Sequence, residues 1–86
     1  MKKLTKARVK KLIELHEYYS NGLRLLSGVS VCATNLRREN DIWVADVTFS
    51  EWDEDGGEAD VYAGWKYSEK ELRSIEAKLM KEKLLN

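Results

Sequence analysis

The acidic segment 51–56 is the part of the chain whose residue types come closest to a site for chemistry. Carboxylates alternate from Glu51 onward and a glycine follows them, as in the first half of a calcium-binding loop. The second half departs from that pattern, because Ala59 and Tyr62 stand where further oxygen ligands belong. The flanking residues also predict strands, where an EF-hand has helices. The segment therefore predicts no EF-hand and no dedicated metal site, and leaves only adventitious weak binding of divalent ions open.

The other candidates for catalysis are equally incomplete. Paired carboxylates serve glycosidases, but such enzymes need a substrate cleft, and 86 residues are few for building one. His16 is the single histidine and Cys32 the single cysteine, and no second ligand or activating partner stands near either in the sequence. Both are interpreted as structural or incidental. We therefore expect a protein without enzymatic activity, metal or cofactor.

Charge is distributed very unevenly along the chain. Residues 39–65 carry nine carboxylates and no Lys or Arg, whereas residues 1–38 carry nine bases and two acids. With six bases and four acids in residues 66–86, the segment charges are +7, −9 and +2, behind a formal net charge of zero. Segregation of this kind favours electrostatic docking on a partner.

Length and composition predict one small domain, 1–86. Hydrophobic residues make up 43% of the chain, which is enough for one core. A single cysteine allows no internal disulfide, which fits a reducing compartment. No apolar h-region follows the basic start, and no stretch approaches the roughly 18 apolar residues of a membrane span. We expect a soluble, cytoplasmic protein.

Hydrophobic periodicity and capping signals predict five elements. A helix is expected from about Lys6 to Asn21, with Thr5 as its N-cap and Gly22 as its stop. A second helix is expected after Ser68, because the Ser-x-x-Glu pattern that begins there fits a capping box. Period-two alternation and turn residues predict three strands within residues 23–36, 43–50 and 59–67, joined by turns at 37–41 and 55–57.

The order α-β-β-β-α predicts an α+β fold, in which a three-stranded antiparallel sheet is flanked by two helices on one face. Trp52 is out of phase with the inward-pointing residues Trp43 to Phe49. It either points away from the core as an interface anchor or, if the strand is bulged, belongs to the core. The face opposite the helices is expected to show water Asp46, Thr48, Ser50, Asp60, Tyr62 and Lys66.

This element order resembles that of the double-stranded-RNA-binding domain. The resemblance would imply RNA binding through a basic run at the start of the last helix and a Pro- and His-containing loop between the first two strands. Here the last helix starts with Ser68-Glu69-Lys70-Glu71, which is not a basic run. The loop at residues 37–41 is Arg-Arg-Glu-Asn-Asp, without Pro or His, so both places depart from the family. A nucleic-acid-binding module remains one alternative, and its phosphate contacts would come from Lys2, Lys3, Lys6, Arg8, Lys10 and Lys11.

The leading hypothesis is a small non-enzymatic interaction protein, an inhibitor or regulator that docks its acidic hairpin and sheet face on a basic surface of another protein. A nucleic-acid-binding enzyme offers such a surface, which carboxylates could occupy as phosphate mimics. A chain of this size and charge suits a phage or mobile element. The alternatives are a solvated loop without a binding role and self-association through the opposite charges. The expected partner-binding residues are Asp46, Glu51, Trp52, Asp53, Glu54, Asp55, Glu58, Asp60 and Tyr62.

Overall fold

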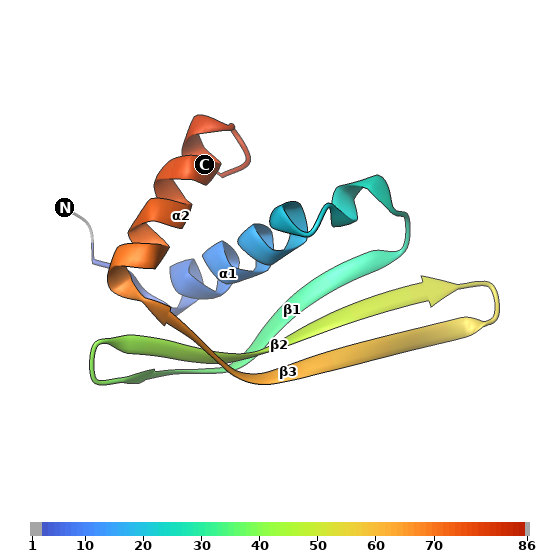
Figure 1. Cartoon of the computed structure of the whole chain (residues 1–86), viewed down its shortest axis with the longest axis horizontal. Coiled ribbons are helices and arrows are strands. Elements are labelled where there is room, and N and C mark those ends of the chain that lie inside the picture. The colour runs from blue at the N-terminus through green and yellow to red at the C-terminus, as the bar shows by residue number, and fades with distance from the viewer. Residues whose placement is uncertain (1–2, 86) are drawn as a thin grey trace.

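The predicted element order is confirmed by the computed structural model, which describes residues 3–85 except for the Asp53 side chain. Lys2, one of the expected basic contacts, lies outside the described residues. The elements, shown in Figure 1, are α1 (Lys6–Ser20), the short 3-10 turn η1 (Leu23–Leu25), β1 (Val29–Glu39), β2 (Ile42–Asp53), β3 (Gly56–Ser68) and α2 (Glu69–Lys81).

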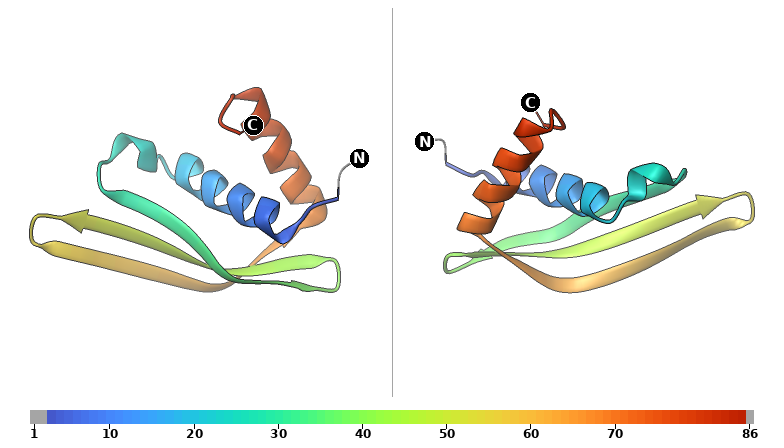
Figure 2. Two further views of the ribbon diagram at one scale, coloured as in Figure 1. Left: turned by 180° about the vertical axis from the view of Figure 1, so that it is seen from behind. Right: turned by 45° about the horizontal axis from the view of Figure 1, so that its top comes forward.

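The three strands form one antiparallel sheet in the order β1-β2-β3. Both helices lie on the same side of this sheet, which we call the inner face (Figure 1). Helix α1 runs along the sheet beside β1, whereas α2 crosses α1 and points away from the strands (Figure 2). The buried core joins all these elements and includes Val9, Leu12, Ala33, Val47 and Leu72. As a result α2 is anchored largely on α1, and the β3 side of the inner face is left less covered.

Local capping fixes the start of both helices as expected. The Thr5 hydroxyl accepts a hydrogen bond of 3.2 Å from the Arg8 backbone N–H. At α2 the capping box is complete, because the Ser68 hydroxyl accepts from the Glu71 N–H at 3.1 Å and the Glu71 carboxylate accepts from the Ser68 N–H at 3.2 Å. Gly22, which follows α1, adopts φ of 68°, the left-handed conformation that ends a helix.

Two polar contacts hold α1 on the sheet. One Glu14 carboxylate oxygen accepts a hydrogen bond of 2.8 Å from the Ala33 backbone N–H, a group that β1 does not use for pairing with β2. The Tyr67 hydroxyl donates to Glu17 at 3.1 Å. Burial of the ring, together with the Glu17 charge, raises the pKa of Tyr67 well above its ordinary value. The edge of β1 is therefore tied to α1.

The first strand differs from its predicted bounds. Residues 23–25 form η1 instead of the start of a strand, and β1 continues through Arg37 and Arg38, which were expected in a turn. The turn itself is reduced to Asn40 and Asp41. Arg38 is accommodated because its guanidinium lies over the Trp43 ring of the paired strand, 5.8 Å from the ring centroid. Cross-strand stacking thus overrides the local turn signal.

Each edge strand contains one bulge, and both bulges lie opposite the same stretch of β2. The β1–β2 register shifts between Thr34 and Arg37, where Asn35 has φ of 51°. The β2–β3 register shifts between Ala45 and Val47, opposite Gly64, whose φ is 72°. One extra residue in a strand moves all later side chains to the other face.

The β3 bulge makes the predicted face of its first half wrong. Tyr62 pairs directly with Val47, and Asp60 pairs with Phe49, so both lie on the inner face and not on the opposite, outer face. Asp46, Thr48, Ser50 and Lys66 do lie on the outer face, as expected; their strand partners include Val44 and Val61. The expected acidic sheet face is consequently divided between the two sides of the sheet.

Candidate docking surface

Strands β2 and β3 form a hairpin that extends beyond the helices (the yellow end in Figure 1). Its turn is Glu54-Asp55, one residue earlier than expected, because Asp53 pairs with Gly56. On the inner face of this hairpin, Glu51 pairs with Glu58, and Asp60 follows in the next inner-face row. We call this exposed set the acidic hairpin end; its members are Glu51, Glu54, Asp55, Glu58 and Asp60.

The acidic hairpin end receives little compensation from the rest of the fold. Within the described residues, Glu51, Glu54, Glu58 and Asp60 form no ion pair with a base. Glu51 and Glu58 face each other across the two strands, an arrangement of like charges that disfavours the isolated fold. Their negative potential is therefore directed at solvent.

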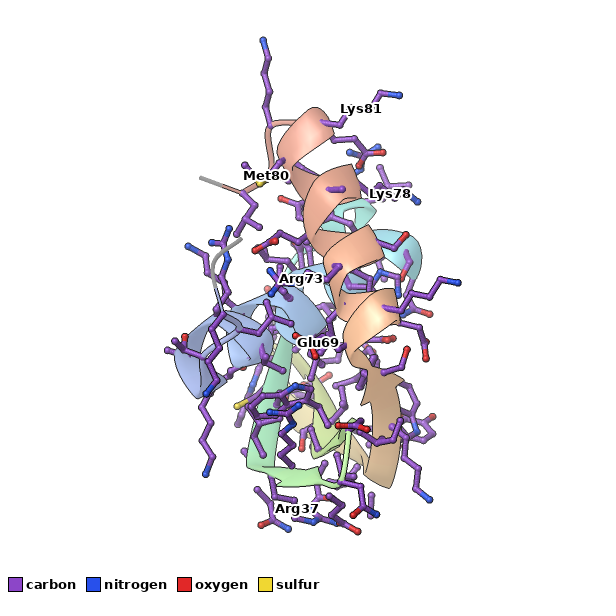
Figure 3. All side chains as sticks on the ribbon, turned by 90° about the vertical axis from the view of Figure 1, so that its left-hand side faces the viewer. Arg37, Glu69, Arg73, Lys78, Met80 and Lys81 are labelled. Atoms are coloured by element: carbon purple, nitrogen blue, oxygen red, sulfur yellow. The ribbon has the colours of Figure 1, made fainter. Side chains whose placement is uncertain are left out.

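Several bases lie toward the other end of the molecule, which measures 46 Å along its longest axis. Helix α1 starts at the end opposite the hairpin tip (Figure 1), and Arg37, Arg73, Lys78 and Lys81 are seen when this end faces the viewer (Figure 3). The charge segregation along the sequence is thus in part also a segregation in space. An exception is Arg24, which lies in η1 beside Leu23 on the hairpin side.

Several of these bases are already engaged. Arg8 pairs with Glu76 at 2.9 Å, and Lys10 pairs with Glu14 on the same helix. These contacts link α1 to α2 and support the Glu14 side chain that binds β1. Arg8 and Lys10, two bases of α1, therefore stabilise the packing of the fold.

Trp52 lies on the outer face and is 66% exposed. Its backbone N–H donates to the Gly28 carbonyl at 2.9 Å, and its ring lies against Gly57, where an added Cβ would be 2.5 Å from the ring. Because consecutive strand residues point to opposite faces, Glu51 and Trp52 point to opposite sides of the hairpin. Of the two alternatives for Trp52, the structure shows the exposed one, with the side chain on the face opposite that of Glu51.

On the side of Trp52 away from the turn, the outer face carries uncharged residues. The rows next to it contain Ser50 paired with Ala59 and Thr48 paired with Val61, which is 63% exposed. Cys32, also exposed, pairs with Thr48 from β1. This part of the outer face is neutral, in contrast to the inner face of the same hairpin.

Asp46 connects the two bulges through its carboxylate. One oxygen accepts from the Gly64 backbone N–H at 3.0 Å and the other from the Asn35 side-chain amide at 3.3 Å. The Gly64 hydrogen bond, followed by that of Asn35, lowers the pKa of Asp46. Since the fold itself occupies both oxygens, we leave Asp46 out of the docking surface.

We expect Asp46 to make the stability of the fold sensitive to acid. A depressed folded-state pKa stabilises the fold above the unfolded-state pKa of about 3.9, and this contribution is lost as pH falls through the folded-state pKa. The free energy of unfolding should therefore fall between about pH 5 and pH 2, and Asp46→Asn should fall less steeply. Urea unfolding at a series of pH values measures both slopes. Parallel slopes would show that the Asp46 contacts contribute nothing.

An aromatic cluster lies on the inner face beside the acidic hairpin end. The Phe49 ring centroid is 5.7 Å from that of Tyr62 and 6.0 Å from that of Trp65, both in edge-on arrangements, and the Tyr62 and Trp65 centroids are 5.2 Å apart. With Asn21, Leu23 and Asp60, these rings line an open hollow of about 470 Å³. We call it the aromatic hollow.

The aromatic hollow was not predicted, because Tyr62 was expected on the outer face of a regular strand. The bulge at Gly64 brings both rings to the inner face. A glycine inside a strand pattern is a known signal for a bulge, and Gly64 supplied that signal.

Metal-binding clusters and membrane-spanning helices are two further kinds of feature, and the described residues contain neither. Among the side chains that the structure describes, no group of three or more His, Cys, Asp and Glu is placed to hold a metal ion. His16 is partly exposed and its Nε2 lies 4.0 Å from Glu17. Within residues 3–85, neither helix is long and apolar enough to cross a membrane.

Comparison with models of protein families, with curated proteins and with solved structures gives no match for this chain.

Proposed function

We propose that this chain is a small non-enzymatic interaction protein that binds a basic surface of another protein through the acidic hairpin end. The observation that carries the proposal is the position of its carboxylates. Glu51, Glu58 and Asp60 share one face of a projecting hairpin, without ion-pair partners among the described residues and away from the basic end of the molecule.

The hairpin is suited to docking because its shape is fixed before binding. Strand pairing continues to Asp53 and Gly56, the last residues before the two-residue turn, and β1 supports the hairpin as far as Glu51 through Val29. A prearranged surface loses little conformational entropy on binding. Its uncompensated charge also accelerates encounter with a positively charged partner.

A nucleic-acid-binding protein is the partner class that best fits this surface. Grooves that hold a nucleic-acid backbone present rows of Lys and Arg to phosphates, and a rigid row of carboxylates can pair with the same side chains. By occupying such a groove, the chain would act as an inhibitor or regulator.

The test is capture of a basic partner from a lysate by the intact chain and by a triple variant, Glu51→Gln with Glu54→Gln and Glu58→Gln. We expect the triple variant to lose capture, because three uncompensated charges are removed from the docking surface. Duplex DNA added in excess should compete with the captured partner.

The matched control carries the same change in net charge at other positions, Glu39→Gln with Asp41→Asn and Glu82→Gln, and should still capture the partner. Equal capture by the wild type and the triple variant would contradict the proposal. The separation of charge in space also favours head-to-tail self-association. A triple variant that changes only the sedimentation of the chain itself, and captures as before, would favour that alternative.

A further inference from the structure

We propose that the aromatic hollow is an arginine subsite, which receives the guanidinium group of an arginine on the partner. The inference rests on the proposed function, because it names the side chain that the acidic hairpin end would guide into place. Three features carry it: aromatic rings that are partly exposed, a carboxylate at the rim, and the absence of a helix over the β3 side of the hairpin.

The rings of the hollow are arranged to offer π surface to a ligand. Phe49 meets Tyr62 at an interplanar angle of 82° and Trp65 at 61°, so the three rings do not form one flat stack. Tyr62 remains 46% exposed. A hollow of about 470 Å³ lies in the range of roughly 300–1,000 Å³ that small ligands occupy. One side chain therefore has space here.

Charge makes a cation the preferred occupant. Asp60 lines the hollow, and Glu51 and Glu58 form the next inner-face row toward the turn. Among the described residues, the cation–ring contacts that the structure shows involve other rings, Tyr19 and Trp43. A cation over an aromatic face gains from the ring quadrupole, and a carboxylate beside it strengthens the attraction.

The geometry favours arginine over lysine. A guanidinium is planar, so it can stack on a ring and still donate two parallel hydrogen bonds to a carboxylate such as Asp60. A lysine ammonium is a compact, strongly hydrated charge that cannot do both. The chain itself places an arginine guanidinium over an aromatic ring twice, with Arg24 5.9 Å from the Tyr19 ring centroid and Arg38 5.8 Å from that of Trp43.

The hollow is open because of how the helices pack. Helix α1 lies beside β1, and α2 crosses α1 and leaves the sheet, so neither helix covers the β3 side of the hairpin (Figures 1 and 2). Asn21 and Leu23, just after α1, form the wall of the hollow on the helix side. A partner that contacts the acidic hairpin end can reach the rings without a change in fold.

The test uses three acetylated and amidated peptides, each alternating glycine with three copies of arginine, lysine or the neutral isostere citrulline. Binding is measured by calorimetry at low salt, and the indole N–H signal of Trp65 is followed by NMR. We expect the arginine peptide to bind about fivefold more tightly than the lysine peptide and to shift the Trp65 signal. The citrulline peptide should bind least.

Variants separate the subsite from general attraction by the acidic hairpin end. Asp60→Asn and Tyr62→Leu should each weaken arginine-peptide binding about fivefold and remove the preference over lysine. Glu54→Gln is the charge control, because it removes one negative charge as Asp60→Asn does, but at the turn. It should weaken binding of the arginine peptide less than twofold. Tyr62→Leu keeps an apolar side chain against Phe49, and Tyr62→Phe, which keeps the ring, should bind like the wild type.

The outcomes distinguish this inference from the proposed function. Equal binding of the arginine and lysine peptides, unchanged by Tyr62→Leu, would overturn the subsite and leave the basic-partner proposal supported. No binding of either cationic peptide would also overturn the subsite, and the capture experiment with the triple hairpin variant would then decide the proposed function by itself. The subsite is supported if Asp60→Asn and Tyr62→Leu lose the preference for arginine while Glu54→Gln and Tyr62→Phe keep it.

Discussion

Replacement of Leu12 by alanine is expected to lower the free energy of unfolding by about 3 kcal/mol. Leu12 is fully buried and lies in the cluster that joins α1 to the sheet and to α2. The substitution removes apolar contacts and leaves a cavity that the surrounding side chains fill only in part. In a domain of 86 residues this is a large share of a total stability of roughly 5 kcal/mol. Urea unfolding followed by circular dichroism measures the loss.

Leu25→Ala is the matched control, because the same atoms are removed from a side chain that is 82% exposed. The free energy of unfolding should change by about 0.5 kcal/mol or less. Similar losses for Leu12→Ala and Leu25→Ala would contradict the core described above.

The second large effect is expected for Gly28→Ala, at about 2–3 kcal/mol of destabilisation. Gly28 has φ of 76°, and an added Cβ would lie 2.5 Å from the Trp52 carbonyl oxygen. Alanine there meets both backbone strain and a clash with a backbone atom that cannot rotate away. The hydrogen bond from the Trp52 N–H to the Gly28 carbonyl, 2.9 Å long, would have to shift.

Gly64→Ala separates the two causes. Gly64 has φ of 72°, close to that of Gly28, but an added Cβ would meet nothing within 4 Å. Only backbone strain remains, so the expected loss is about 1 kcal/mol. Thermal unfolding of both variants gives the comparison, and equal losses would show that the close approach of Gly28 to Trp52 has no energetic role.

The features predicted well from the sequence depend on neighbours in the chain. Thr5 and Ser68 cap their helices because a cap bonds to backbone groups two or three residues away. The element order follows from the same local periodicities. For Trp52 the sequence left exposure and burial open, and the exposed alternative holds because β2 has no bulge of its own.

The features predicted poorly depend on contacts between distant segments. The local sequence predicts a turn at Arg37 and Arg38. Pairing of both residues with β2, and stacking of Arg38 on Trp43, extend the strand through them. The faces of Asp60 and Tyr62 depend on whether Gly64 is accommodated as a bulge, which the register with β2 decides. Periodicity alone treats Gly64 as one more position in a regular alternation.

The candidate site was recovered in part for the same reason. The acids of segment 51–58 were correctly expected around one hairpin turn, since a turn gathers its own neighbours. Asp46 was expected to face a partner, but its hydrogen bonds go to Gly64 and Asn35, which are 18 and 11 residues away. Such long-range contacts have no signature in a single sequence.

The bulge at Gly64 makes the surface chemistry of the hairpin depend on a count of residues. Side chains of β3 alternate between the two faces of the sheet. The extra residue in β3 therefore reverses the face of every residue between the bulge and the turn, relative to a regular strand. A regular strand of the same sequence, without the bulge, would carry Tyr62, Asp60 and Glu58 to the side of Trp52, whereas deletion of Gly64 would remove the bulge and leave all three on the inner face. The position of charge on this protein is therefore set by one bulge in β3 as much as by the composition of the strand.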